Sequence, residues 1–386
     1  MITWNNLDKL ASFKELEKVS KVNLVEAMTG ENGAERVKNF SVPMAEGLAY
    51  NYAAKQVDDA VLTGLKNLAE EAQLAEKFEA LYNGEVINTG EKRLVLHHLT
   101  RGQLGDTVTA DGVDKRAFYK EQQDKIADFA NKVHAGEITN AAGEKFTTVV
   151  QIGIGGSDLG PRAMYLALEG WAKKNNTFKM EAKLISNVDP DDASAVLPYS
   201  QALSRFPAHL QQLDMESNGK SVNRFGEPVD YVTGPVIFGE PGTNGQHSFY
   251  QLLHQGTDIV PLQFVGFRNN QMETDVVIQG STSQQKLCAN VAAQIVAFAC
   301  GKADDNRNKN FEGGRPSSII IGDQLNPGSL GALLAHFENK VMFQGFLWNV
   351  NSFDQEGVQL GKVLAKRVLA HETDGALKVF SDLLNI

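Results

Sequence analysis

The first part of the chain shows the periodicity of amphipathic helices. Val57, Val61, Leu65 and Leu68 recur at spacings of three and four residues, which places them on one face of a helix. The stripe ends near Asn83-Gly84, a pair typical of a helix C-terminus. We therefore expect residues 1–145 to form a helical N-terminal region.

From residue 147 the pattern changes to strands that alternate with helices. Residues 147–152 and 182–186 read as strands, and a glycine cluster and a helical stretch over 161–171 lie between them. Strand, turn, helix and strand begin a parallel α/β unit. A doubly wound domain usually needs roughly 100–150 residues, so we expect residues 146–195 to be the remnant of a first αβα domain.

The remaining residues, 196–386, predict a second and more complete αβα domain with C-terminal helices. Its expected strands are residues 235–238, 259–265 and 317–321, and its expected helices are residues 283–300, 329–337 and 355–369. The fold class is therefore α/β.

Composition and charge narrow the function. The chain is 42% hydrophobic and 22% charged, as in ordinary globular proteins, with no apolar run of 18 residues and no signal-like N-terminus. Two cysteines, Cys288 and Cys300, match no metal or redox spacing and are expected to be reduced core thiols. These features predict a cytoplasmic protein. A net charge of −10 argues against nucleic acid or an anionic membrane as partner, but a single phosphate can still be held by backbone N–H groups.

A glycine-rich turn is the first candidate site. Residues 153–161 read Gly-Ile-Gly-Gly-Ser-Asp-Leu-Gly-Pro, where glycines expose backbone N–H groups, Ser157 adds a hydroxyl and Pro161 suits the first position of a helix. The dinucleotide fingerprint fails, because Asp158 stands where its third glycine belongs. Phosphate binding and a simple tight turn both explain this segment.

Two titratable side chains stand next to turn-forming residues. Glu216 precedes Ser-Asn-Gly, so it is expected at the end of an element, where it is either a general base or an ordinary solvated glutamate. His247 follows the loop 239–246 and is expected at the start of a helix over 248–254. A helix N-terminus favours a neutral imidazole able to exchange protons.

Other polar residues have weaker cases. Lys362 borders the apolar arc of its expected helix, where a snorkelling lysine is the ordinary interpretation. Arg315 in Phe-Glu-Gly-Gly-Arg-Pro is expected in a loop that leads into a strand. His97, His98 and Arg101 have no metal-ligand spacing and are expected to be structural.

Taken in order, five segments resemble the phosphoglucose isomerase family. They are residues 153–161, Leu-Pro-Tyr-Ser-Gln at 197–201, Gln-Gln-Leu-Asp-Met-Glu-Ser-Asn-Gly-Lys at 211–220, Gly-Glu-Pro-Gly-Thr-Asn-Gly-Gln-His at 239–247 and Asn-Ser-Phe-Asp-Gln…Gly-Lys at 351–362. The resemblance implies two αβα sandwiches of the SIS type, a C-terminal arm and a homodimer with shared active sites. It implies interconversion of glucose 6-phosphate and fructose 6-phosphate through a cis-enediol, in glycolysis and gluconeogenesis, with no metal or organic cofactor.

The resemblance also implies a role for each matching residue. Glu216 would move the proton between C2 and C1, and His247 and Lys362 would assist ring opening. Gly155, Gly156, Ser157, Gln212 and Gln355 would line the sugar-phosphate site. The residue types suit the reaction, which needs a positioned base and separate proton donors and acceptors.

One departure from the family is large. Between Ser-Asn-Val-Asp at 186–189 and residue 197 the family carries most of its first SIS domain, including a Ser/Thr-rich phosphate loop and a Gly-Gly-Arg-(Phe/Tyr)-Ser motif whose arginine stabilises the enediolate. Their absence predicts an isomerase that is slowed by about 10²–10³, and leaves open a chain that is inactive or poorly folded. It also leaves open a non-catalytic SIS-type module that binds sugar phosphate or a protein. A nicotinamide-dependent dehydrogenase is the more distant alternative.

Overall fold

The computed structural model describes residues 2–152, 156–185, 195–272 and 274–386. Its helices are α1 (Ala11–Leu16), α2 (Leu24–Thr29), α3 (Gly33–Asn39), α4 (Asp59–Glu71), α5 (Leu74–Tyr82), α6 (Lys115–Ala135), α7 (Gly156–Lys174), α8 (Phe206–Gln211), α9 (Gly242–Gln246), α10 (Tyr250–Gln255), α11 (Ser283–Cys300), α12 (Pro327–Leu347), α13 (Gln359–Leu369) and α14 (Gly375–Leu383). Its strands are β1 (Ser41–Pro43), β2 (Ala49–Asn51), β3 (Thr109–Ala110), β4 (Val113–Asp114), β5 (Thr148–Ile152), β6 (Glu181–Ile185), β7 (Val196–Pro198), β8 (Leu262–Asn269), β9 (Val277–Ile278), β10 (Ser281–Thr282) and β11 (Ser317–Gln324).

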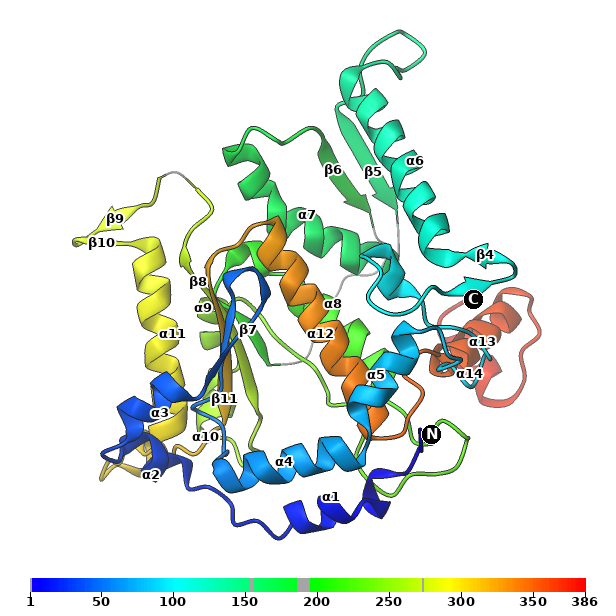
Figure 1. Ribbon diagram of the computed structural model, residues 1–386. Helices are drawn as coiled ribbons and strands as arrows, with labels where there is room; N and C mark the ends of the chain where they lie inside the picture. The colour runs from blue at the N-terminus through cyan, green and yellow to red at the C-terminus, as the bar shows by residue number, and fades with distance from the viewer. Residues whose placement is uncertain (1, 153–155, 186–194, 273) are drawn as a thin grey trace.

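A five-stranded sheet in the order β1-β2-β11-β8-β7 forms the centre of the molecule (Figure 1). Strands β7, β8 and β11 are parallel, and β2 pairs with β11 in the antiparallel sense. Successive side chains of a strand point to opposite faces. Val265 and Ile320 accordingly pack with α8 and α12, whereas Phe264 and Ile319 pack with α10 and α11. The sheet is therefore buried on both faces, which confirms an αβα sandwich.

Most elements of this second unit agree with the sequence pattern, and two do not. The helix expected over 283–300 is α11, with the same bounds, and the strands expected over 259–265 and 317–321 are β8 and β11. Residues 235–238, expected as a strand, form none; this segment lies beside β7, where Phe238 accepts a hydrogen bond from the Val196 amide at 2.7 Å. The helix expected over 329–337 is longer and spans all of α12.

The N-terminal region is less purely helical than its pattern predicts. Its strands β1 and β2 extend the central sheet by pairing with β11. Of the stripe expected from Val57, residues Val61, Leu65 and Leu68 lie in α4, which begins after Val57. A second helix, α5, follows Gln73, whose φ is +51°. A three-residue strand is too short to show a period, so this part of the sheet is decided by tertiary pairing.

A second, small sheet contains only β5 and β6. The two strands are parallel, with Thr148 opposite Glu181 and Ile152 opposite Ile185, and α7 connects them. This agrees with the two strands expected in the incomplete first unit. In Figure 1 they stand beside α6 in a projection away from the central sheet. Val150 and Ile152 are 54% and 74% exposed, so this sheet is open to solvent.

Helix α7 begins five residues earlier than expected. Pro161 lies inside it, not at its first position. A proline there has no N–H to donate to the carbonyl four residues earlier. That carbonyl, of Ser157, instead accepts a hydrogen bond from the Gln151 side chain at 3.0 Å. A glutamine on β5 thus supplies the missing donor and joins strand and helix.

Candidate active site

Glu216 ends a π-helical turn, Gln212–Glu216, that continues directly from α8. The buried side chains of Phe206 and Leu210 anchor α8 in the core, so the helix from which the turn continues has a fixed position. Single π-helical turns are frequent at functional sites. Glu216 is half-buried, which confirms its expected place at the end of an element. Gln212 opens the same turn.

A lysine fastens the Glu216 turn to the loop that carries Gln355. The Lys220 ammonium donates to the backbone carbonyls of Glu216 at 3.1 Å, Ser217 at 2.7 Å and Asp354 at 3.0 Å. Its nitrogen is also 3.2 Å from the Asp354 carboxylate, and both side chains are mostly buried. Two sequence motifs more than a hundred residues apart, 211–220 and 351–362, are thereby held side by side.

A second set of contacts also joins the Glu216 turn to the loop before Gln355. Asn218 is fully buried; its amide donates to the Val341 carbonyl at 3.0 Å and its oxygen accepts from the Ser352 hydroxyl at 2.6 Å. Asn351 donates to Asn88 at 2.9 Å. Because each polar group here is satisfied by a particular partner, the loop before Gln355 has a defined position. Gln355 itself is exposed.

The Glu216 turn also contains one member of a charged pair that the sequence did not predict. The Asp214 carboxylate is buried 3.8 Å from the Lys340 ammonium. Burial raises the pKa of Asp214 and lowers the pKa of Lys340, and each charge partly opposes the shift of the other. Lys340 lies three residues beyond the helix expected over 329–337, and no motif in the sequence marked it as a candidate.

A cavity of about 280 Å³ adjoins this turn, lined by His97, Arg101, Ser217, Glu338 and Ser352 among others. Arg101 pairs with Glu338 at 2.6 Å. Burial lowers the pKa of His97. His97 and Arg101 were expected to be structural, and the structure places both beside the Glu216 turn.

His247 lies at the C-terminal end of a helix. The sequence placed it at a helix N-terminus, and that expected position is wrong. It caps α9, donating its backbone N–H to the Asn244 carbonyl at 3.0 Å, and the next helix, α10, starts three residues later. The short sequence Gly-Thr-Asn-Gly-Gln resembles a loop, which is why α9 was missed. His247 is exposed.

The position of α9 is set by a buried tyrosine of another motif. A Cβ added to Gly242 would lie 2.0 Å from the Tyr199 ring, so only glycine fits there. The Tyr199 hydroxyl bonds to the Asn290 oxygen at 2.9 Å, and the Asn290 amide donates to Gln246 at 3.2 Å. The motifs 197–201 and 239–247 therefore form one packed unit next to His247.

Lys362 lies on α13, after a short 3-10 turn at Glu356–Val358, and is exposed. The apolar arc that it borders is exposed as well: Leu360, Val363 and Leu369 are all more than half exposed. In α14, Val379, Phe380 and Leu383 are also more than half exposed. The C-terminal arm thus has an apolar face without a cover in this single chain.

The glycine turn is only partly within the described residues. Gly155 lies outside them, and Gly156 is the first residue of α7. Ser157 follows in the first turn and is exposed. Asp158 is buried and its carboxylate pairs with Arg162 at 2.8 Å, so the residue that breaks the dinucleotide fingerprint has a structural partner.

The structure therefore joins some predicted site residues and separates others. Glu216, Gln212 and the loop before Gln355 share one junction. In Figure 1, α9, which ends at His247, and α13, which carries Lys362, lie on different sides of α12.

Two other polar features are structural. Arg315 is buried and donates to the carbonyls of Gly256 at 2.9 Å and Asp258 at 3.2 Å, as expected for a residue that orders a loop before β11. His98 is buried against the Tyr82 ring. Over the described parts of the chain, no group of histidine, cysteine, aspartate and glutamate is arranged to hold a metal ion.

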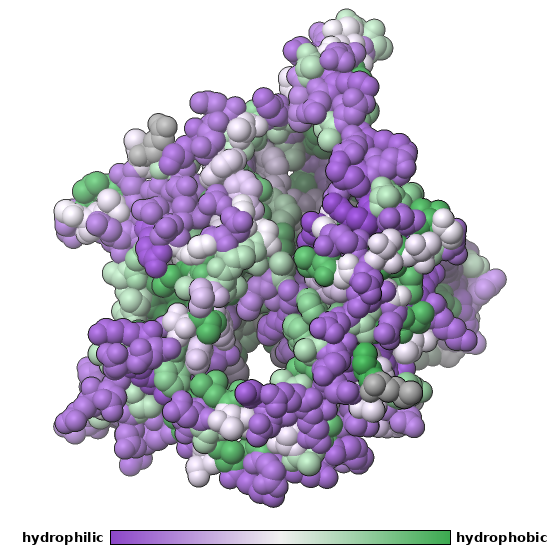
Figure 2. All heavy atoms as spheres, viewed as in Figure 1, coloured by the Kyte–Doolittle hydropathy of each residue, from purple (hydrophilic) through white to green (hydrophobic). Residues whose placement is uncertain are grey.

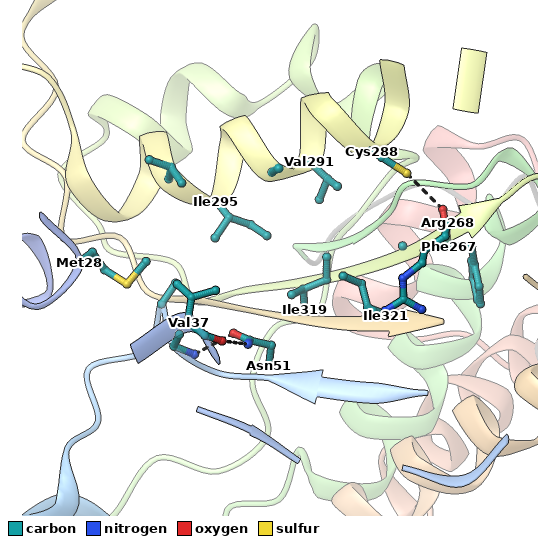
Figure 3. Close-up of a pocket in the computed structure, with 15 residues that line it drawn as sticks. Met28, Val37, Asn51, Phe267, Arg268, Cys288, Val291, Ile295, Ile319 and Ile321 are labelled. Carbon is teal, nitrogen blue, oxygen red and sulfur yellow. Dashed lines mark hydrogen bonds between the residues drawn. The ribbon is translucent and has the colours of Figure 1, made fainter. Parts of the chain in front are cut away.

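A further cavity is lined mainly by apolar side chains. It has a volume of about 370 Å³ and lies between α11 and the central sheet, where Val291, Ile295, Ile319 and Ile321 line it (Figure 3). Cys288 closes one side by donating to the Phe267 carbonyl at 3.3 Å. No helix of the described residues has the length and apolar character needed to cross a bilayer.

A mixed sheet with a parallel centre, buried between helical layers, defines the α/β class of protein. The model of the family "Phosphoglucose isomerase" matches residues 51–194 and 191–382. The glucose-6-phosphate isomerase of Treponema denticola is 47% identical over 526 aligned positions that cover 99% of each chain, and that of Borreliella burgdorferi is 36% identical over 516 positions that cover 96% and 97%. The crystal structure of a glucose-6-phosphate isomerase from Chlamydia trachomatis is 30% identical, with a TM-score of 0.86 and coverage of 99% of each chain.

The chain belongs to the phosphoglucose isomerase family. Membership confirms the fold class and the isomerase that the sequence motifs predict, and it does not favour a non-catalytic module. The Treponema denticola alignment has 526 positions and this chain has 386 residues, so about 140 positions of the relative have no counterpart here. The two family matches adjoin at residues 191–194, which places the gap just after β6.

Proposed function

We propose that this chain interconverts glucose 6-phosphate and fructose 6-phosphate, with Glu216 as the base that moves a proton between C2 and C1. The observation that carries the proposal is the junction at Lys220, which holds the Glu216 turn against the loop of Gln355. A base removes a proton efficiently only when it is held within reach of the substrate carbon. A turn fixed by buried hydrogen bonds at both ends meets that need.

The other predicted residues take complementary places. Gly155, Gly156 and Ser157 would bind the sugar phosphate through backbone N–H groups. Gln212 and Gln355 flank Glu216 in the chain segments joined by Lys220 and would bind sugar hydroxyls. Proton transfer of this kind asks for no metal or organic cofactor.

Ring opening would use residues of two subunits. His247 is exposed and set apart from Lys362, and the apolar face of the C-terminal arm is uncovered. Exposed apolar patches of this kind mark protein–protein contacts. In a homodimer the arm would pack on the partner, and His247 of one subunit would complete the site that holds Glu216 and Lys362 of the other. The substrate and the net charge of −10 suit a cytoplasmic enzyme with no nucleic-acid or membrane partner.

The rate is expected to be low. The segment absent after β6 is where the family carries its phosphate loop and its enediolate-stabilising arginine, and loss of one oxyanion stabiliser costs about 10²–10³ in rate. Weaker phosphate binding removes further energy that drives the chemical step.

The test is a coupled assay of fructose 6-phosphate conversion. Glu216→Gln keeps size and hydrogen bonding but removes the base, and should lower kcat by about 10²–10⁴. Glu79→Gln on the exposed side of α5 is the matched control and should leave kcat unchanged. Equal rates for the two variants would refute Glu216 as the base.

A further inference from the structure

We propose that α6 and the β5–β6 sheet form a docking surface for a separate polypeptide equivalent to the inserted segment of about 140 residues in the relatives. Binding of that segment in trans would complete the first αβα domain and restore the rate. The effect on rate rests on the proposed function; the binding does not.

The first observation is the face of α6. Phe118, Ile126 and Phe129 lie on one stripe of this 21-residue helix and are 43%, 68% and 60% exposed. Lys120 and Asp124, which pair with each other, lie on the opposite side of the helix, and the pairs Lys132–Asp128 and Lys125–Glu121 border the stripe on one side. A helix with one charged and one apolar face normally buries the apolar one. Figure 2 shows hydrophobic residues in the recess between the α6 projection and the body around α7.

The second observation is the β5–β6 sheet. Parallel sheets occur almost only with both faces covered, and a two-stranded sheet is marginal by itself. Here Val150 and Ile152, which point to the same face, are mostly exposed. The pairing leaves an unpaired edge on each strand, which is a ready site for a further strand.

The third observation identifies the occupant. Strand β6 ends at Ile185, and the next strand within the described residues is β7, which belongs to the central sheet. The family matches break between these strands, at residues 191–194. About 140 residues are what a doubly wound domain needs. A second copy of this chain offers the same open face and edges, not the strands and helices that would cover them.

The experiment co-expresses the full chain with a tagged polypeptide, the segment of the Treponema denticola protein that has no counterpart here. The two should co-purify in a 1:1 ratio, and isomerase activity should rise at least about 100-fold over the chain alone. Ile126→Asp buries a charge at the proposed contact, so at least about 10-fold less segment should be retained. Asn131→Asp adds the same charge about 140° away from Ile126 around the helix and should change nothing.

Each outcome is decisive. A soluble segment that does not co-purify, or that is retained equally by both aspartate variants, overturns the proposal. Self-association of the chain alone that Ile126→Asp abolishes shows a second copy as occupant and overturns it too. Co-purification without a gain in activity supports the docking surface and counts against the proposed function.

A covalent version covers the case of an insoluble segment. The same segment is inserted between residues 190 and 195, and thermal unfolding is measured for both chains. Ile126→Asp should leave the Tm of the present chain unchanged, since the side chain is exposed, and should lower that of the extended chain by several degrees. An equal effect in the two chains overturns the proposal.

Discussion

The Lys220 junction offers the sharpest test of how this chain holds its candidate base. Replacing Lys220 with methionine keeps the length of the side chain and removes its charge. Three backbone carbonyls, of Glu216, Ser217 and Asp354, then lose their donor, and the Asp354 carboxylate loses its counter-ion. Since the side chains of Lys220 and Asp354 are only 15% and 17% exposed, water replaces these contacts poorly.

The size of the effect follows from that burial. Removing one partner of a buried ion pair costs about 3–5 kcal/mol, and the slight exposure here favours the lower end, about 3 kcal/mol. The entropy of unfolding is about 2.1 cal/mol/K per residue, or about 0.8 kcal/mol/K for 386 residues. Lys220→Met should therefore lower the Tm by about 4 °C.

Thermal unfolding followed by circular dichroism measures this shift. Lys378→Met is the matched control, because Lys378 pairs with Asp382 at 3.1 Å with both side chains about 60% exposed, and such pairs contribute at most about 1 kcal/mol. Lys220→Met should also lower kcat, since the Glu216 turn loses its link to Asp354. A Tm within 1 °C of the unmodified chain would show that the junction does not hold the turn.

Three further predictions concern single contacts. Gln151→Leu should lower the free energy of unfolding by about 1 kcal/mol, because it removes the donor that replaces the missing N–H of Pro161. In a Pro161→Ala background that loss should vanish in urea titrations, and an undiminished loss would contradict the pairing. Gly242→Ala should cost about 2 kcal/mol by collision with the tyrosine ring packed on it, whereas Gly331→Ala, which has open space on α12, should be neutral or stabilising; equal costs would refute the packing argument. Burial lowers the pKa of Lys77 to about 8, below its ordinary 10.5, so between these pH values the unfolded chain binds the proton and the folded chain does not. The free energy of unfolding should therefore rise by up to about 3 kcal/mol from pH 8 to 10.5, and Lys77→Met should remove that rise; an unchanged slope would refute the assignment.

Much of the second domain was predictable because its periodic segments are long. The 18 residues of α11 carry both a helical period and a Thr282–Gln285 capping box, so pattern and structure agree on its bounds. The run Ile-Ile-Ile at 319–321 is apolar and β-branched, as suits a strand such as β11 that is packed on both faces. By contrast, β2 and α9 are three and five residues long, and so short an element shows no period.

The candidate site was predictable only as separate segments. Ser-Asn-Gly after Glu216 correctly indicated the end of an element. Nothing in the spacing showed that Lys220 reaches Asp354, 134 positions away, or that Asp214 and Lys340 form a buried pair. Such pairs form because the tertiary packing brings the two residues together, and their separation in the sequence does not predict it.

By itself the sequence determined the α/β class and the family, and it predicted the candidate site residues and the shortness of the first unit. All of these depend on local pattern or on residues read in order. Only the tertiary structure decided that β1 and β2 complete the central sheet, that His247 ends a helix, and that α6 and the β5–β6 sheet have uncovered apolar surfaces. Burial and pairing are properties of the whole fold, so a segment's own composition can show that it should be covered, but not whether another part of the chain covers it.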